Sequence, residues 1–471
     1  MSGRSRTIWA FVITSLALFM GSLDNLVVTT ALPVIRVQLH ASLSSLEWTV
    51  NAYTLSFAVL LLTGATLGER FGRRRMLIVG LTIFTLGSAA AALSPTTATL
   101  ILARMVQGSG AAIVTPLTLT ILSSAVPAAR RGLALGAWGA VGGMAVALGP
   151  VVGGAIVQGI SWKWIFWLNV PLGVALIPLA RWRLTESHGP IRHFDGRGLV
   201  LASAGLFGIV LGLVRGNDVG WTSTQVVASI LLGALALAAF VAWELRARDP
   251  MLPMRLFRSR GFSAANLASF FMFFGLFGSV FLLAQFLQTA QHYTPLQAGL
   301  RILPWTAMPI LVAPIAGVLS DRIGGRVVVT TGLVLQSIGL VWVALVTSVS
   351  VSYATLVPGF VVSGIGMALF FAPVANTVLS SVDPSQEGIA SGATNAIREL
   401  GGVFGIAVLA AVFAGHGGYV SPAAFVSGLR PAVEVGAGVV GLGALAMLFV
   451  PRRVRGTKLA VERAEPELVA A

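Results

Sequence analysis

Cysteine is absent from this chain of 471 residues, and lysine occurs only at positions 163 and 458. Without cysteine the chain has no disulfide framework and no thiol chemistry. Charge is scarce as well: 10% of the residues are charged, 56% are hydrophobic, and the mean hydropathy is +0.89. A water-soluble surface cannot hide that much apolar material, so the composition predicts an integral membrane protein.

The sequence also lacks the motifs of several functional classes. It has no phosphate-binding Walker loop, no paired metal ligands and no nucleophile–base set, which argues against direct use of ATP and against a membrane enzyme. The net charge of +15 comes from arginines scattered between apolar runs and not from one basic face, so we expect no nucleic-acid partner. We expect no cofactor, and a proton gradient as the energy source.

Apolar runs of about 20 residues recur along the chain, which is the length of a membrane-crossing helix, and they lack the alternation of a membrane β-barrel. The first run is expected to be a retained span and not a cleaved signal peptide. We predict an all-α polytopic fold with fourteen spans. Their approximate limits are 8–32, 48–67, 76–94, 99–125, 133–158, 164–182, 198–215, 225–243, 262–287, 298–319, 327–347, 354–380, 389–414 and 433–451.

The arginines predict the orientation. Alternate loops hold most of them, while the other loops hold little beyond Arg36, Lys163, Arg215, Arg301 and Arg430. Because loops rich in arginine stay on the cytoplasmic side, both termini are predicted to be cytoplasmic. The abundance of arginine, alanine and glycine favours a bacterial source, so the predicted location is the bacterial cytoplasmic membrane.

An internal repeat divides the chain. The loop at residues 67–74 recurs at 319–326, so Glu69 corresponds to Asp321 at an offset of 321 minus 69, or 252; the same offset carries residues 149–153 onto 401–405. Parallel repeats of this kind place a substrate site between two halves near mid-membrane. We predict a six-helix bundle at 1–190, two inserted helices at 191–250, and a second six-helix bundle with a tail at 251–471.

One acidic residue, Asp24, lies in the first span, with no other charge between Arg6 and Arg36. A carboxylate at that depth costs about 2.5–3.5 kcal/mol on insertion scales, and such residues usually belong to ion or proton pathways. Arg104 in the fourth span lies at a similar depth, judged at about 1.5 Å per residue. A buried arginine needs a partner, so we predict an Asp24–Arg104 pair; a fixed pair without a transport role is the alternative.

Two further motifs indicate conformational gating. The loop between the second and third spans contains Glu69, Arg70, Gly72 and Arg73, and its second copy contains Asp321 and Arg322; such charges can lock a loop in one state and release it in another. A plain topogenic charge cluster is the alternative. The fifth span contains Gly149 and Pro150, where small residues allow close helix approach and proline allows bending.

These motifs, together with residues 31–33 and 104–112, resemble the signature set of the major facilitator superfamily, and fourteen spans resemble its drug:proton antiporter subfamily. The resemblance implies proton coupling for Asp24 and Arg104, and export for the Gly149–Pro150 motif. Two departures from the pattern are Glu69, where an aspartate is usual, and the opening glycine of the loop motif, which falls at Gly64, one position early.

The thirteenth span contains Arg398 and Glu399, which the repeat does not require. At the offset of 252 they correspond to Val146 and Ala147; at 388 minus 132, or 256, an offset that fits residues 132–134 onto 388–390 better, they correspond to Gly142 and Gly143. We predict that Arg398 and Glu399 line the substrate cavity with Asn25, Gln107 and Asn395, as substrate contacts or a second protonation site. The alternative for each residue is a structural role, in which neighbouring helices supply the partners of its polar or charged side chain.

The predicted function is a monomeric, proton-coupled antiporter that exports a small lipophilic drug or antibiotic by alternating access. A lipophilic cation would suit Glu399 and Asp24, and a neutral antibiotic would suit the phenylalanines at 270–274. The partners are therefore the substrate, protons and membrane lipid. A proton-coupled uptake permease and a lipid flippase of the same fold remain alternatives.

Overall fold

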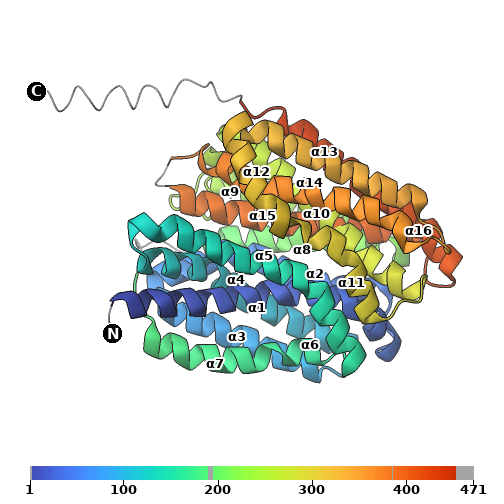
Figure 1. The fold of residues 1–471 in the computed structure, drawn as a ribbon, viewed down its shortest axis with the longest axis horizontal. Coiled ribbons are helices and arrows are strands. Elements are labelled where there is room, and N and C mark those ends of the chain that lie inside the picture. The colour runs from blue at the N-terminus through green and yellow to red at the C-terminus, as the bar shows by residue number, and fades with distance from the viewer. Residues whose placement is uncertain (1–2, 189–194, 384–385, 452–471) are drawn as a thin grey trace, which may run out of the picture.

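The chain forms helices joined by short loops, with no β-strand within residues 3–188, 195–383 and 386–451, which this computed structural model describes (Figure 1). The side chains at 3–4, 128–133 and 321 lie outside the described part. The elements are α1 (Gly3–Gln38), α2 (Leu43–Phe71), α3 (Arg73–Leu93), α4 (Thr97–Ala125), α5 (Ala128–Gly159), α6 (Trp164–Trp167), α7 (Asn169–Arg183), α8 (Gly196–Val219), α9 (Thr224–Glu244), the 3-10 helix η1 (Met254–Arg258), α10 (Arg260–Thr289), α11 (Pro295–Thr306), α12 (Met308–Ile323), α13 (Gly325–Val346), α14 (Tyr353–Leu379), α15 (Glu387–His416) and α16 (Pro422–Met447).

Within the described ranges, fourteen helical segments are long and apolar enough to cross a membrane, which confirms the predicted all-helical class. Two spans are interrupted: α6 and α7 meet at Leu168, and α11 and α12 meet at Ala307. The last span was predicted to begin near residue 433, and this was wrong. Helix α16 begins at Pro422 and includes Arg430, whose Nε donates to the carbonyl oxygen of Thr347 (2.7 Å), so a neighbouring chain segment satisfies this charge.

The two halves repeat the same packing scheme, as the sequence offset predicted. In the first half α1 packs along α5 and α3 packs between α4 and α7; in the second half α10 packs along α15 and α13 packs between α14 and α16. Leu276 of α10 occupies the position in the repeat that Asp24 has in α1, and it is buried among apolar residues. The scaffold therefore does not require an acid at this position.

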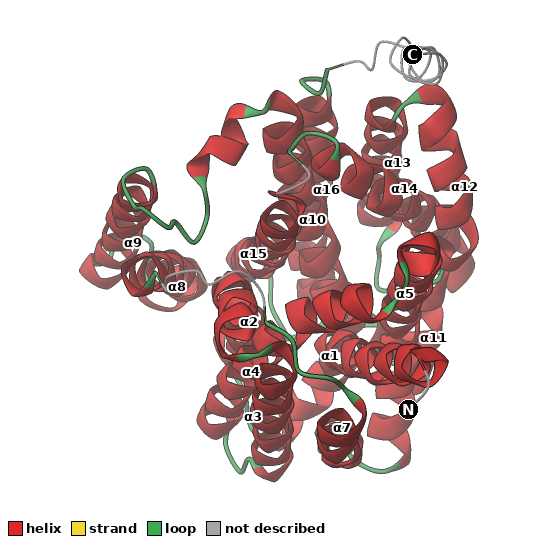
Figure 2. Cartoon of the chain, turned by 90° about the vertical axis from the view of Figure 1, so that its left-hand side faces the viewer, coloured by secondary structure: helices red, strands yellow, loops and turns green. Residues whose placement is uncertain are grey.

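The inserted pair, α8 and α9, lies against one side of the molecule. Helix α8 packs against α2 of the first half and α15 of the second half, while α9 packs mainly on α8 (Figure 2). Leu206, Val210 and Val214 of α8 share an apolar cluster with Leu55 of α2 and Val403 of α15. The inserted helices thus cover the boundary between the two halves where α2 lies next to α15.

The start of α1 and the end of α16 lie at the same end of the helices (Figure 1), which we call the terminal end, and the opposite end we call the far end. Figure 2 looks onto the terminal end. The prediction that the terminal end is cytoplasmic stays a prediction from the arginine distribution.

Candidate functional site

The predicted pair of buried charges is present. Arg104 of α4 donates from Nη1 to Oδ2 of Asp24 in α1, and the two residues expose 0% and 2% of their surface. Helix α1 packs against α4, α5 and α7, which brings Asp24 into the interior of the first half and away from lipid. A buried ion pair of this kind is weak support for stability but holds two charges in one defined geometry.

Two amide side chains complete the coordination of Asp24. Gln107 donates from Nε2 to Oδ1 of Asp24 (2.8 Å), and Asn169, the first residue of α7, donates from Nδ2 to the same oxygen (2.7 Å). Gln107 also accepts from Nη1 of Arg104 (2.7 Å) and bonds to Ser88 of α3 (2.7 Å). Three helices of the first half, α1, α4 and α7, therefore meet at one carboxylate, and α3 joins them through Gln107.

Helix α2 supplies further contacts to Arg104. Nε of Arg104 donates to the carbonyl oxygen of Thr49 (3.2 Å), and its guanidinium carbon lies 4.2 Å from the ring centroid of Tyr53, a cation–π distance. The Tyr53 hydroxyl in turn donates to the carbonyl oxygen of Gly21 (3.2 Å). Nη2 of Arg104 has no partner within the part of the chain that the structure describes.

This arrangement is chemically suited to an ionised Asp24. Its carboxylate accepts three hydrogen bonds, from Arg104, Gln107 and Asn169, and Arg104 also supplies a counter-charge. Neutralising Asp24 would leave the buried arginine without that counter-charge, which is costly.

The predicted cavity residues do not join this cluster, apart from Gln107. Asn25 is half-buried, and its Oδ1 has no partner in the described ranges. On α15, Nη1 of Arg398 lies 3.4 Å from Oδ1 of Asn395, and its guanidinium lies 5.7 Å from the Phe273 ring centroid. Their assignment to the substrate cavity stays a prediction.

Glu399 forms no ion pair with its neighbour Arg398 among the described residues, as expected for adjacent positions on a helix. Its Oε2 is buried without a hydrogen-bond partner there.

The Gly149–Pro150 motif lies where the two six-helix halves meet, in the part of the molecule nearer the far end. A Cβ on Gly149 would lie 2.8 Å from Leu26 of α1, while one on Gly154 would lie 2.3 Å from the carbonyl oxygen of Pro295 in α11. Reciprocally, a Cβ on Gly299 of α11 would lie 2.2 Å from the carbonyl oxygen of Pro150. The small residues thus permit direct backbone contact between α5 and α11.

Other bonds join the halves near the same end. Gln288 of α10 donates to the carbonyl oxygen of Thr30 in α1 (3.0 Å), and the backbone nitrogen of Leu296 donates to Gln158 of α5 (3.3 Å). Toward the terminal end, by contrast, Gly136, Gly139 and Gly143 of α5 have no atom within 4 Å of an added Cβ. The halves are therefore in direct contact along α5 and α11, whereas these three glycines of α5 meet no neighbouring atom.

The charged loop between α2 and α3 turns at Gly72, whose φ of 103° favours glycine. The backbone nitrogens of Arg74 and Arg75 both donate to the carboxylate of Glu186 (2.9 and 3.2 Å), and the nitrogen of Arg73 donates to the carbonyl oxygen of Ser187 (2.9 Å). An anion at a helix N-terminus is stabilised by the free N–H groups and the helix dipole. This loop is thus tied to the segment that follows α7.

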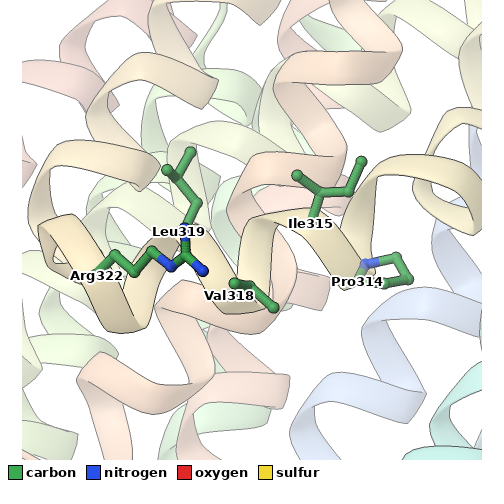
Figure 3. Close-up of a pocket in the computed structure, with 5 residues that line it drawn as sticks. All are labelled: Pro314, Ile315, Val318, Leu319 and Arg322. Carbon is green, nitrogen blue, oxygen red and sulfur yellow. The ribbon is translucent and has the colours of Figure 1, made fainter.

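The second copy of the loop turns at Gly324, with a φ of 92°. The side chain of Asp321 lies outside the described residues. Arg322 lines a cavity of about 400 Å³ together with four apolar residues of α12: Pro314, Ile315, Val318 and Leu319 (Figure 3). The gating roles of Glu69, Arg70, Gly72, Arg73, Asp321, Arg322, Gly149 and Pro150 stay predictions.

Comparison with known proteins identifies the family. The model of the Major Facilitator Superfamily matches residues 14–278 and 265–470. The chain belongs to the major facilitator superfamily. It is 36% identical to the multidrug resistance protein Stp of Mycobacterium tuberculosis over 405 residues, which cover 86% of this chain and 75% of that protein. It is 32% identical to the tetracenomycin C resistance and export protein of Streptomyces glaucescens, over 87% of this chain and 76% of that protein.

Solved structures of the superfamily share the fold. An auto-inhibited peptide transporter of the POT family aligns with a TM-score of 0.69 at 16% identity, over 96% of this chain and 97% of that one. The xylose transporter XylE from E. coli, in a partially occluded inward-open conformation, aligns with a TM-score of 0.64 at 15% identity, over 95% and 98%. The chain is therefore a multi-pass bacterial membrane transporter of this superfamily and not an enzyme.

Asn169 and Glu186 are two residues in these contacts that the sequence analysis missed. Asn169 is a lone amide at the break between α6 and α7, two residues before Pro171, and such a helix break exposes polar groups for new contacts. Glu186 lies in a connector with no motif of its own. The sequence feature that could have indicated Asn169 is its place near a proline in an otherwise apolar span. No sequence feature indicated Glu186.

Proposed function

We propose that this superfamily member is a proton-coupled antiporter that exports small lipophilic compounds across the bacterial cytoplasmic membrane. The observation that carries this proposal is the buried carboxylate of Asp24, held by Arg104, Gln107 and Asn169. It is a single ionisable site whose charge state decides how α1, α4 and α7 pack. A proton arriving there changes the preferred arrangement of the first half.

The coupling follows from this electrostatic balance. When Asp24 is ionised, its bonds to Arg104 favour the arrangement described above. When Asp24 accepts a proton from the far side, the pair breaks and another arrangement of α1 against α4 becomes preferable. A ligand or proton can shift an equilibrium between two states only by its difference in affinity for them, and here the difference is the energy of the buried pair.

The positions of the contacts between halves support alternating access. The two halves are in direct contact along α5 and α11 near the far end, whereas three glycines of α5 nearer the terminal end meet no neighbouring atom. If the terminal end is cytoplasmic, as the arginines predict, this is an inward-facing state. A cavity along α12, lined by Arg322 and four apolar side chains, would suit a lipophilic compound.

The direction and substrate class rest on the relatives, which are named for multidrug resistance and antibiotic export. Substrate contacts are proposed for Asn25, Asn395, Arg398 and Glu399. Arg398 and Glu399 are neighbours on α15, and the Arg398 guanidinium lies 5.7 Å from the ring centroid of Phe273 in α10. A planar lipophilic compound, with or without a positive charge, would suit these groups.

Everted membrane vesicles with an imposed proton gradient, acid inside, test the function. The probes are ethidium, a lipophilic cation, and tetracenomycin C, a polyketide. We expect at least one of them to dissipate the gradient when added to vesicles containing the protein, and not in vesicles lacking it. Probe uptake without any change in the gradient, or translocation of labelled phospholipid alone, would contradict the proposal in favour of a facilitative permease or a lipid flippase.

A further inference from the structure

Arg36, in the last turn of α1, makes a contact that joins the two halves at the far end. Its guanidinium carbon lies 3.8 Å from the ring centroid of Tyr419, which lies in the connector between α15 and α16 of the second half. This is well within the distance of about 6 Å at which a cation is attracted to an aromatic ring. Arg36 has no ion pair with any of the described residues, so the Tyr419 ring is the group that faces its charge.

Tyr419 is held firmly within the second half. Its ring centroid lies 5.5 Å from that of Phe413 in α15 and 5.4 Å from that of Phe425 in α16, and both phenylalanines are fully buried. Its hydroxyl donates to Oε1 of Gln285 in α10, which is also fully buried. The Tyr419 ring therefore moves with the second half and not with α1.

The backbone of the connector is fixed as well. The nitrogen of Gly417 donates to the carbonyl oxygen of Phe413 (2.9 Å), and the nitrogen of Gly418 donates to that of Ala424 (3.2 Å). A Cβ on Gly417 would lie 2.1 Å from the carbonyl oxygen of Ala424, so a glycine is needed for the connector to approach α16 this closely. The connector thus presents Tyr419 to α1 in one defined position.

The contact does not depend on the ionisation of Tyr419. Burial raises the pKa of its phenol above the usual value, although Arg36 acts in the opposite direction, so the phenol is neutral at physiological pH. Arginine keeps its charge throughout the same range. Unlike the Asp24–Arg104 pair, this contact therefore has no protonation state that could break it.

Opening of the far end would separate these two residues. On α1, fewer than two turns before Arg36, the carbonyl oxygen of Thr30 accepts a hydrogen bond from Gln288 of α10 (3.0 Å). Both contacts join α1 to the second half. If α1 moves away from α10 at the far end, the guanidinium of Arg36 leaves the Tyr419 ring and returns to water.

We propose that Arg36 and Tyr419 form a latch, which holds the far end closed and is released once in each transport cycle. The contact exists in the closed state alone, so it shifts the equilibrium between the closed and open states by its full strength. Both residues are half-buried, and cation–π contacts are stronger where water is partly excluded. This inference rests on the proposed alternating access and adds a pair of positioning residues to it.

A distance measurement between the two halves tests the latch. Val37 and Val420, the neighbours of the two latch residues, are 69% and 97% exposed, and the chain has no cysteine, so Val37→Cys with Val420→Cys can carry two spin labels. Pulsed electron paramagnetic resonance in lipid nanodiscs measures the populations at short and long distances. The short distance should dominate in the labelled parent chain. Tyr419→Leu and Arg36→Gln should each raise the long-to-short ratio about tenfold.

Three further variants make the result specific. Tyr419→Phe keeps the ring and loses only the hydrogen bond to Gln285, so it should keep the parent ratio. The double variant Arg36→Gln with Tyr419→Leu should raise the ratio no further than either single change, because both remove the same contact. Arg301→Gln is the matched control: the Arg301 guanidinium lies 3.7 Å from the ring centroid of Tyr293, but both residues belong to the second half. It should leave the ratio unchanged.

An unchanged ratio in Tyr419→Leu or Arg36→Gln would overturn the inference, as would additive effects in the double variant, which indicate two separate structural roles. The proposed function has its own readout, the dissipation of the proton gradient in everted vesicles. If the parent chain does not dissipate the gradient, the proposed function fails whatever the distances show. If it does so while Tyr419→Leu keeps the parent ratio, only the latch fails.

Discussion

Replacing Asp24 with asparagine should abolish proton-driven export while leaving the protein in the membrane. Asparagine matches the shape of aspartate, so Gln107 and Asn169 keep an acceptor, but Arg104 loses its counter-charge. Breaking a buried pair by removing one partner typically costs about 3–5 kcal/mol. Driven transport of ethidium should fall to the level of vesicles without protein, at every pH tested.

A double variant separates coupling from stability. Asp24→Asn with Arg104→Gln removes both charges, so the buried arginine no longer destabilises the fold. We expect the melting temperature in detergent to recover toward that of the parent chain, whereas proton-driven transport stays absent. If restoring stability also restores driven transport, Asp24 is a structural residue and the proton is carried elsewhere.

Introducing leucine at Gly154 should have an equally large effect on conformation. A Cβ at this position would lie 2.3 Å from the carbonyl oxygen of Pro295, so the larger side chain cannot be accommodated while α5 and α11 are in contact. Overpacking typically costs about 1–3 kcal/mol, which changes a two-state equilibrium by about 5- to 150-fold. We expect the population to shift toward a state open at the far end, with loss of transport.

The absence of cysteine makes this shift measurable. A single Thr30→Cys substitution places a thiol at a fully buried position of α1, where the backbone carbonyl binds Gln288 from the other half. A membrane-impermeant maleimide added from the far side should label it slowly in the parent background and many-fold faster with Gly154→Leu. Gly139→Leu is the matched control, because an added Cβ there meets no atom within 4 Å. Equal labelling in all three backgrounds would show that this contact does not gate the far end.

The Asp24–Arg104 pair could be predicted from the sequence because two strong constraints act on it. Apolar runs fix the helices, and charges in such runs must find partners at their own depth. The repeat was also visible, since residues 67–74 and 319–326 share a turn glycine, and both Gly72 and Gly324 adopt a positive φ. These features depend on local sequence and on helix geometry alone.

Other contacts could not be predicted, because they depend on how helices rotate and where they break. Asn169 reaches Asp24 only because the sixth span is interrupted at Leu168, which sets the direction of its side chain. Glu186 binds the start of α3 from a connector with no pattern of its own. The charge of Arg430 suggested that this residue lies in a loop. Instead it lies within α16, where its Nε donates a hydrogen bond to the carbonyl oxygen of Thr347.

The Gly149–Pro150 motif is an intermediate case. Its glycines predicted close helix packing, but not the partners: Gly149 and Gly153 face α1, whereas Gly154 faces α11 of the other half. Spacing on a helix tells which residues share a face, and only the tertiary structure tells what that face contacts.

Proton release on substrate binding is the most direct test of the central claim, that the protonation of Asp24 is linked to substrate binding. Purified protein in weakly buffered detergent solution is titrated with ethidium or tetracenomycin C, and the pH is followed with an indicator dye. Over a series of pH values, saturation of the parent chain should release up to about one proton per molecule, as linkage requires. Asp24→Asn should release none while still binding the probe. Equal proton release by both proteins would contradict the account.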